Sequence, residues 1–384
     1  MLMIDNGTFC MAPFKNAVID KDGSMLPCCE YMSPSKSATI TDINRWWIQD
    51  LNALRTSMID GIPNEGCRHC LSKENNPGYQ SHRFAQNNQH ARDIESTIAN
   101  YKNGQVGDIS TIEIRVSNYC NLSCIMCGGY ASSSIAHEYR THKDKYNAIG
   151  LTMFDLDTVA WWENEENLKN LQQVLENVKT INFSGGEPLI VPQVVDILNF
   201  LDPVQIKSIT FYTNLTKLSD RMLTAFKRFK KIKLGVSLEG VGEYNDYIRH
   251  GSKWSTIEHN INLAKQYSNI EIMPTHVLQH TSLFSLPGLI DFCQHNKFSL
   301  GLHEIYYNSY PGPGVLTINS AEAADVDKFK TWLNTYHGRY KNLLTNWVNS
   351  YKFDSTLNEK FHEYIDMLDG IRGKDFQTTF KNIS

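Results

Sequence analysis

The sequence predicts an α/β fold in which parallel strands alternate with helices. Strand-like runs begin near Thr111, Lys179, Lys207, Ile232, Ile270 and Ser299. Between them, apolar residues recur at helical spacing, for example in LKNLQQVLENV (168–178) and LPGLIDFCQHN (286–296). This alternation is typical of βαβ units, in which a helix crosses over between two parallel strands. Six such units run from about Ile112 to about Tyr307.

Composition favours a globular enzyme over several other classes. The chain has 384 residues, which permits one large domain and a smaller module, and its formal net charge is −4 with 20% charged residues. No basic excess indicates nucleic acid as a partner, and no apolar run indicates a membrane span. Nine cysteines without a predicted export signal favour metal ligation over disulfides, so we expect a cytoplasmic protein.

Three cysteines follow the first predicted strand. Cys120, Cys124 and Cys127 have the spacing CxxxCxxC in VSNYCNLSCIMCGGY, directly after TIEIRV. Three thiolates can hold three corners of a 4Fe–4S cluster and leave one iron open to bind and reduce a small molecule. A structural zinc site or buried thiols are the alternatives, but zinc prefers four ligands.

A glycine-rich turn follows the second predicted strand. Gly185, Gly186, Glu187 and Pro188 come directly after KTINFS. Glycines let the backbone approach a ligand closely, and a carboxylate beside exposed peptide groups can bind an ammonium group. Ligands of parallel α/β structures lie at the carboxyl ends of strands, where both motifs stand.

Together the two motifs resemble the radical S-adenosylmethionine (SAM) superfamily. The resemblance implies a partial (β/α)6 barrel and a 4Fe–4S cluster whose open iron binds SAM. It also implies that one electron, from a flavodoxin- or ferredoxin-like donor, splits SAM into methionine and a 5′-deoxyadenosyl radical. The radical chemistry belongs to the cofactor, while the protein supplies binding and orientation. By the same resemblance, the turn at Gly185, Gly186 and Glu187 holds the methionine amino group.

Further positions match the superfamily pattern. The resemblance places Met126 near adenine and Asn214 at the SAM ribose. It places Ser237 and Glu239 at the ribose or the methionine part, and Arg249 at the SAM carboxylate. Core packing for Met126, a turn role for Asn214 and a surface charge for Arg249 are the alternatives.

A second group of cysteines precedes the predicted barrel. Cys10, Cys28, Cys67 and Cys70 form C-x12-G-x4-C followed by CxxC, with a hairpin predicted in NAVIDKDGSMLPC. This pattern resembles the auxiliary cluster module of twitch and SPASM-type radical SAM proteins, in most of which the module follows the barrel. The resemblance implies one auxiliary 4Fe–4S cluster. Zinc remains an alternative, and Cys29 could replace Cys28 as a ligand.

The chain then divides into three predicted parts. Residues 1–107 form the cysteine module and a linker, 108–318 the radical SAM core, and 319–384 a helical tail. The polar strand-end residues His276, Glu304, Tyr306 and Tyr307 are candidates for proton or hydrogen transfer. The loop at 307–316 is either a substrate lid or a simple connection. We expect the Trp161–Trp162 pair to pack or to line a substrate channel, and Cys293 to be structural.

These features predict a radical SAM enzyme that abstracts hydrogen from a peptide or protein, because twitch and SPASM relatives often modify peptides. The missing peptide-docking winged domain weakens that choice. A small metabolite, such as a sugar or nucleoside, is the first alternative. A non-catalytic, metal-stabilised binding protein is the second, and it leaves the GGEP turn unexplained. The sequence leaves the oligomeric state open.

Overall fold

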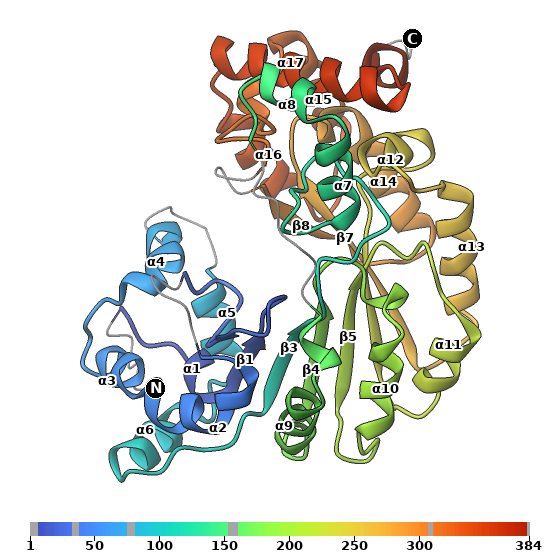
Figure 1. The fold of residues 1–384 in the computed structure, drawn as a ribbon. Coiled ribbons are helices and arrows are strands. Elements are labelled where there is room, and N and C mark those ends of the chain that lie inside the picture. Colours follow the sequence, from blue (N-terminus) through green and yellow to red (C-terminus); the bar gives the residue numbers. More distant parts are fainter. Residues whose placement is uncertain (1–6, 33–37, 75–80, 153–159, 306–309, 382–384) are drawn as a thin grey trace. The chain divides into compact units, whose positions relative to one another are not determined.

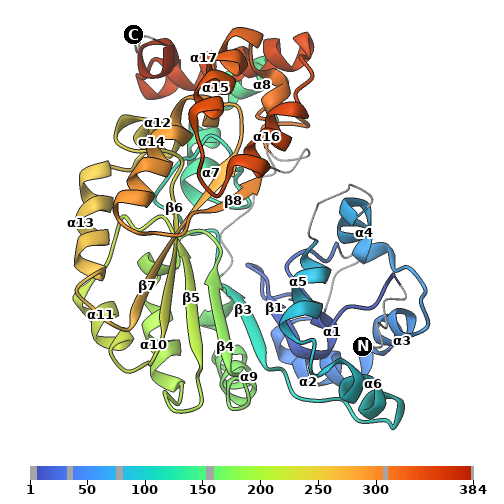
Figure 2. The ribbon, with the colours of Figure 1, turned by 180° about the vertical axis from the view of Figure 1, so that it is seen from behind.

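A computed structural model describes the chain except for residues 1–6, 33–37, 75–80, 153–159, 306–309 and 382–384. Figures 1 and 2 show its helices and strands from opposite sides. Contacts divide it into two compact units, which are described separately. The first unit comprises residues 1–117, 159–211 and 220–232, and the second comprises 118–158, 212–219 and 233–384. The predicted three-part division remains a prediction.

Eight strands, in the described part of the chain, form one sheet in the order β2-β1-β3-β4-β5-β6-β7-β8. Their bounds are β1 (Asn16–Ile19), β2 (Met25–Leu26), β3 (Thr111–Arg115), β4 (Thr180–Ser184), β5 (Ser208–Thr213), β6 (Ile232–Ser237), β7 (Ile270–Leu278) and β8 (Gly301–Glu304). The last six are the strands predicted from the sequence. The alternation of strands and helices confirms the α/β class, since each apolar strand is followed by an amphipathic helix.

The N-terminal hairpin of the first unit extends the sheet. β1 pairs antiparallel with β2, which confirms the predicted hairpin, and parallel with β3 from Asn16↔Thr111 to Ile19↔Ile114. The sequence analysis did not anticipate the second pairing. All four residues of β1 are buried, as expected for a strand with a neighbour on each side and both faces covered.

The helices of the first unit supply the cysteine module and cover its strands. They are α1 (Ala12–Lys15), α2 (Ile43–Arg45), α3 (Asn52–Ile59), α4 (Arg68–Glu74), α5 (His82–Gln89), α6 (Ile94–Lys102), α9 (Glu165–Leu175), α10 (Gln193–Phe200) and α11 (Asp220–Phe226). Phe183 and Phe211 stack in its core with ring centroids 4.8 Å apart. Trp161 and Trp162 are buried, and the Trp162 indole donates to the Val116 carbonyl at 2.8 Å. That contact supports the packing role for the tryptophan pair.

The second unit contains the remaining helices of the described chain. They are α7 (Ser133–Thr141), α8 (Lys143–Ala148), α12 (Glu243–Ile248), α13 (Trp254–Ala264), α14 (Ser282–His295), α15 (Ala323–Thr335), α16 (Lys341–Asn349) and α17 (Ser355–Arg372). α7 and α8 meet at His142. β7 and β8 pair in parallel from Thr275↔Gly301 to Leu278↔Glu304. The predicted helical tail is confirmed.

The C-terminal helix α17 packs against the region that follows the CxxxCxxC motif. It lies beside α7 and α8 in both ribbon views (Figures 1 and 2). Arg372 at its end pairs with Glu138 of α7 at 2.9 Å, and both side chains are largely buried. Residues of α7, α8 and α17 share a core rich in aromatic residues, which includes Phe361, Tyr364 and Phe376. Within the described residues, no helix is both long enough and apolar enough to span a membrane.

Candidate functional site

The loop with the three cysteines, in the second unit, is held by hydrogen bonds to its backbone. The Cys120 amide donates to Ser133 Oγ at 3.1 Å, and Ser134 Oγ donates to the Cys120 carbonyl at 2.7 Å. The Tyr364 hydroxyl of α17 donates to the Ile125 carbonyl at 2.7 Å. These bonds satisfy backbone groups that the irregular loop cannot pair within itself, and so they hold its conformation.

The sulfur atoms of this loop lie beside hydrogen-bond donors. Arg249 Nη1 is 3.7 Å from Cys124 Sγ, and Asn214 Nδ2 is 3.9 Å from Cys120 Sγ. A hydrogen bond from the Cys127 thiol, together with the positive charge of Arg249, lowers the pKa of Cys124 to about 7 in spite of its burial. The same bond and burial raise the pKa of Cys127 well above its usual value. None of these three cysteines is in a disulfide, so their chemistry fits cluster ligation.

Asn214 lies after β5 and contacts the cysteine loop. Its Nδ2 donates to Asn121 Oδ1 at 3.1 Å, and its Oδ1 accepts from the Thr216 amide at 2.9 Å. The side chain is buried and bridges the end of β5 to the loop. It is therefore also a positioning residue for Cys120, a role that the sequence analysis did not assign. The predicted ribose contact remains a prediction.

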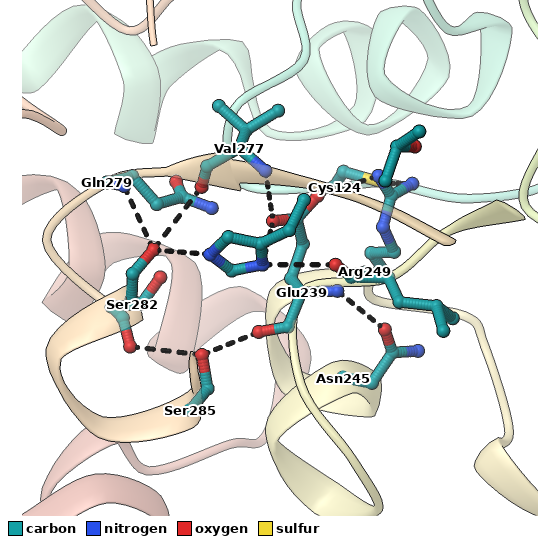
Figure 3. Close-up of polar contacts among 12 residues, drawn as sticks. Cys124, Glu239, Asn245, Arg249, Val277, Gln279, Ser282 and Ser285 are labelled. Carbon is teal, nitrogen blue, oxygen red and sulfur yellow. Dashed lines mark hydrogen bonds and ion pairs between the residues drawn. The ribbon is translucent and has the colours of Figure 1, made fainter. Parts of the chain in front are cut away.

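Glu239 and Arg249 form a buried ion pair next to Cys124. Arg249 Nη2 donates to Glu239 Oε1 at 2.8 Å, with side-chain exposures of 12% and 0%. Glu239 Oε2 accepts from the Val277 amide at 3.2 Å and lies 3.2 Å from His276 Nδ1. Figure 3 shows these contacts. Arg249 is therefore not a surface charge, and both oxygens of Glu239 already have protein partners.

Two other predicted SAM contacts of the second unit are less constrained. Ser237 is half-buried at the end of β6. Met126 is partly buried and packs against the aromatic core that contains Tyr364. The contact agrees with its alternative role in packing, and its place near adenine stays a prediction.

The GGEP turn belongs to the first unit and requires glycine. Gly185 has φ +120°, and a Cβ there would lie 2.6 Å from the Ser117 carbonyl oxygen, too close for any side chain. The Gly186 amide donates to the same oxygen at 2.7 Å. Glu187 is buried, and its Oε1 accepts from the Leu189 amide at 2.9 Å. The turn therefore has a defined backbone shape that presents peptide groups and a carboxylate.

The N-terminal cysteines converge in the first unit. Cys10, Cys28, Cys67 and Cys70 all line one enclosed pocket, together with apolar side chains such as Pro13, Pro27 and Met58. In the described part of the chain, no three His, Cys, Asp or Glu side chains are arranged to hold a single metal ion. The four thiols thus line one pocket, and four thiolates can hold either a 4Fe–4S cluster or a structural zinc ion.

Burial dominates the chemistry of these four thiols. It raises the pKa of Cys10 to about 12 and that of Cys67 to about 11, and it raises the pKa of Cys28 and Cys70 as well. The thiols therefore stay protonated at neutral pH until a metal replaces their protons. The Ala12 amide donates to Cys10 Sγ at 3.4 Å, a contact that also suits a metal-bound sulfur.

An ion pair near this pocket was not anticipated. Arg83 Nη2 bonds Glu74 Oε2 at 2.6 Å, and Arg83 Nη1 donates to the Phe9 carbonyl at 3.0 Å. The Arg83 side chain is 4% exposed. Arg83 lines the pocket, and Phe9 precedes Cys10. The sequence carries no signal for this pairing beyond the nearness of both residues to the CxxC pair.

The remaining cysteines and strand-end candidates have diverse environments. Cys29 is exposed, does not line the pocket, and has its sulfur 3.8 Å from His82 Nε2. Cys293 is buried in α14, as expected for a structural residue. His276 is buried at the end of β7, whereas Glu304 is exposed on β8. Tyr306 and Tyr307, and with them part of the predicted lid, lie outside the described residues.

Comparison with known proteins identifies the class. Residues 114–281 match the family model of the radical SAM superfamily, and they contain both motifs. Residues 114–281 therefore form a radical SAM domain. The cofactors of such a domain are a 4Fe–4S cluster and SAM, and the thiols and donors of the CxxxCxxC loop fit that pair.

Curated relatives share part of this domain. A probable GTP 3',8-cyclase of Methanocaldococcus jannaschii is 24% identical over 49% of this chain and 56% of that protein. A probable GTP 3',8-cyclase of Methanothermobacter marburgensis is 30% identical over 29% of each chain. This chain therefore spans little more than half the length of the first relative and less of the second.

Solved structures with a similar fold are more distant. One is anSMEcpe with bound AdoMet, at 18% identity, 62% coverage of both chains and a TM-score of 0.41. Another is Streptococcus suis SuiB bound to the precursor peptide SuiA. It is 15% identical and covers 74% of this chain and 58% of that chain, with a TM-score of 0.42.

Proposed function

We propose that Cys120, Cys124 and Cys127 ligate the SAM-binding cluster and that the N-terminal pocket holds one auxiliary 4Fe–4S cluster. The enzyme then abstracts hydrogen from a peptide or protein substrate. The convergence of Cys10, Cys28, Cys67 and Cys70 on one enclosed pocket is the observation that carries this proposal. It supports the resemblance of the N-terminal pattern to the auxiliary cluster module.

Within this proposal the protein's own residues bind and orient. When bound, the cluster and SAM supply one-electron cleavage of SAM and a radical that abstracts hydrogen. The turn at Gly185, Gly186 and Glu187 offers peptide groups and a carboxylate to the methionine ammonium. Arg249 Nε is buried with no hydrogen-bond partner among the described residues, which leaves one donor for a bound group such as the SAM carboxylate. A flavodoxin- or ferredoxin-like protein delivers the electron.

The auxiliary site is proposed as a closed cluster and not as zinc. Its four thiols line one pocket, and their spacing in the sequence resembles the auxiliary cluster module, which supports the cluster. Cys28 is proposed as the ligand in preference to Cys29, because only Cys28 lines the pocket.

A second candidate keeps the radical chemistry and changes the substrate. The matched relatives in two archaea carry the description of a probable GTP 3',8-cyclase, which acts on a nucleotide. A small nucleotide or related metabolite is therefore the competing substrate class. The resemblance to the auxiliary cluster module favours the peptide, because twitch and SPASM-type proteins often modify peptides.

Isotope transfer separates the two substrate classes. The reconstituted enzyme is incubated without oxygen with SAM, a reductant and deuterated GTP or a deuterated peptide encoded beside the gene. We expect deuterium in 5′-deoxyadenosine from the peptide and none from GTP. Transfer from GTP alone would replace the peptide proposal by the nucleotide one. A Cys124→Ala variant serves as the control that forms no 5′-deoxyadenosine.

A further inference from the structure

The guanidinium of Arg249 joins a cluster cysteine to a buried carboxylate. One terminal nitrogen, Nη1, lies 3.7 Å from Cys124 Sγ, and the other, Nη2, donates to Glu239 Oε1 at 2.8 Å. Two donors of a planar guanidinium thereby have different partners. The orientation of the group toward the sulfur consequently depends on where the Glu239 carboxylate is held.

The second oxygen of Glu239 lies beside a histidine. Glu239 Oε2 accepts from the Val277 amide at 3.2 Å and lies 3.2 Å from His276 Nδ1. Nδ1 also lies 3.1 Å from the Leu238 carbonyl oxygen. Both neighbours of Nδ1 are acceptors, so Nδ1 carries the ring proton. Burial lowers the pKa of His276, although the negative charge of Glu239 acts in the opposite direction. The ring is therefore neutral, and its N–H end lies against the carboxylate without cancelling the charge.

A serine completes the chain of contacts. Ser282 Oγ lies 2.7 Å from His276 Nε2, and it accepts from the Gln279 amide at 2.9 Å. Since His276 Nε2 lacks a proton, the Ser282 hydroxyl donates to it and fixes the ring. The contacts therefore run from Ser282 through His276, Glu239 and Arg249 to Cys124. Figure 3 labels Ser282, Glu239, Arg249 and Cys124 in this region. We name Ser282, His276 and Glu239 the relay.

We propose that the relay is a redox-tuning device: it holds the Arg249 guanidinium against the Cys124 ligand sulfur and thereby raises the reduction potential of the SAM-binding cluster. The inference rests on the cluster ligands assigned in the proposed function. A hydrogen bond from a cation to a ligand sulfur stabilises the reduced cluster, which carries one more negative charge. A guanidinium that moves away from the sulfur leaves the cluster harder to reduce.

Packing alone does not account for this arrangement. A buried ion pair contributes little to stability compared with well-packed apolar residues, because both charges must be removed from water. Ser282, His276 and Glu239 are all fully or almost fully buried. Contacts of this kind around the ligands of a metal centre orient the ligands and tune its potential. Ser282 and His276 are accordingly positioning residues that act through Glu239 and Arg249.

The test is the midpoint potential of the cluster signal that changes when SAM is added. It is measured by electron paramagnetic resonance (EPR) titration of the full-length reconstituted enzyme and of Ser282→Ala, His276→Leu and His276→Gln. Ser320→Ala is the matched control, because Ser320 is also buried and its Oγ also contacts a buried histidine, His280, at 3.0 Å. Among the described residues, no hydrogen bond or ion pair joins Ser320 or His280 to Cys124, Arg249 or Glu239.

We expect more negative midpoint potentials in Ser282→Ala and His276→Leu, with the larger shift in His276→Leu. The midpoint potential of His276→Gln, whose amide can donate to Glu239, should be closer to that of the wild type. The midpoint potential of Ser320→Ala should equal that of the wild type. Midpoints in Ser282→Ala and His276→Leu equal to that of Ser320→Ala would overturn the inference. If His276→Leu loses its cluster, the midpoint potentials of Ser282→Ala and His276→Gln test the inference in its place. A wild-type protein without a SAM-sensitive signal would instead overturn the proposed function.

Discussion

The two groups of cysteines differ in what surrounds their sulfur atoms. The CxxxCxxC loop has a guanidinium at Cys124 and a side-chain amide at Cys120. The four N-terminal cysteines line a pocket together with apolar side chains and Arg83, and burial raises the pKa of each thiol. The donors of the first group can stabilise negative charge on its sulfur atoms, whereas burial favours the neutral thiols of the second group. Cysteine spacing alone does not reveal this difference.

The largest expected effect comes from removing a ligand of the first group. Cys124→Ala should abolish SAM cleavage, since Cys124 is one of only three proposed ligands of that cluster. About four iron atoms per chain should remain in the N-terminal pocket. Iron analysis and the yield of 5′-deoxyadenosine check both expectations. Full SAM cleavage in this variant would rule out the assigned ligands.

The converse substitution separates the two sites. Cys28→Ala should lose the auxiliary cluster, about four iron atoms per chain, while uncoupled SAM cleavage continues. The reason is that the proposed ligand sets share no residue. EPR of the reduced protein should keep the SAM-sensitive signal. An unchanged iron content would show that Cys28 is not a ligand.

A buried ion pair stabilises the unit that contains the auxiliary pocket. Arg83→Met should lower the free energy of unfolding by about 3–5 kcal/mol, because Glu74 would keep a buried charge without its partner. Arg221→Met is the matched control: its pair with Asp196 is 59% and 51% exposed, so its loss should cost under about 1 kcal/mol. Urea unfolding measures both values. Equal losses would contradict the structural role of Arg83.

The smallest effect is expected at the neighbouring cysteine. Cys29→Ala should leave the iron content and the EPR signals unchanged, since Cys29 is exposed and does not line the pocket. The same assays as for Cys28→Ala give a direct comparison of the adjacent residues. Loss of iron from Cys29→Ala, but not from Cys28→Ala, would exchange their assignments.

The sequence predicted the strands and helices well because their apolar patterns are local. Residues 168–178, for example, show the helical period, and α9 covers most of them. The pairing of β1 with β3 was not predictable, because the sequence of a four-residue apolar strand does not indicate which strand it pairs with. The proposed role of Ser282 was equally hidden, because its contact with His276 depends on the folding of β7 and α14.

Among site residues, the sequence located motifs better than contacts. Both signatures were recognised because their spacing is itself the signal. Contact of Arg249 with the SAM carboxylate stays a prediction, whereas the contacts of its terminal nitrogens with Cys124 and Glu239 were not predicted. Packing decides which arginine donor meets which acceptor, and a local sequence pattern does not predict packing.

The most direct test of the account is EPR and iron analysis of the anaerobically reconstituted protein, with and without SAM. The account predicts about eight iron atoms per chain, as two 4Fe–4S clusters, and one cubane signal that shifts when SAM is added. Zinc in place of iron, or a cluster signal indifferent to SAM, would contradict it.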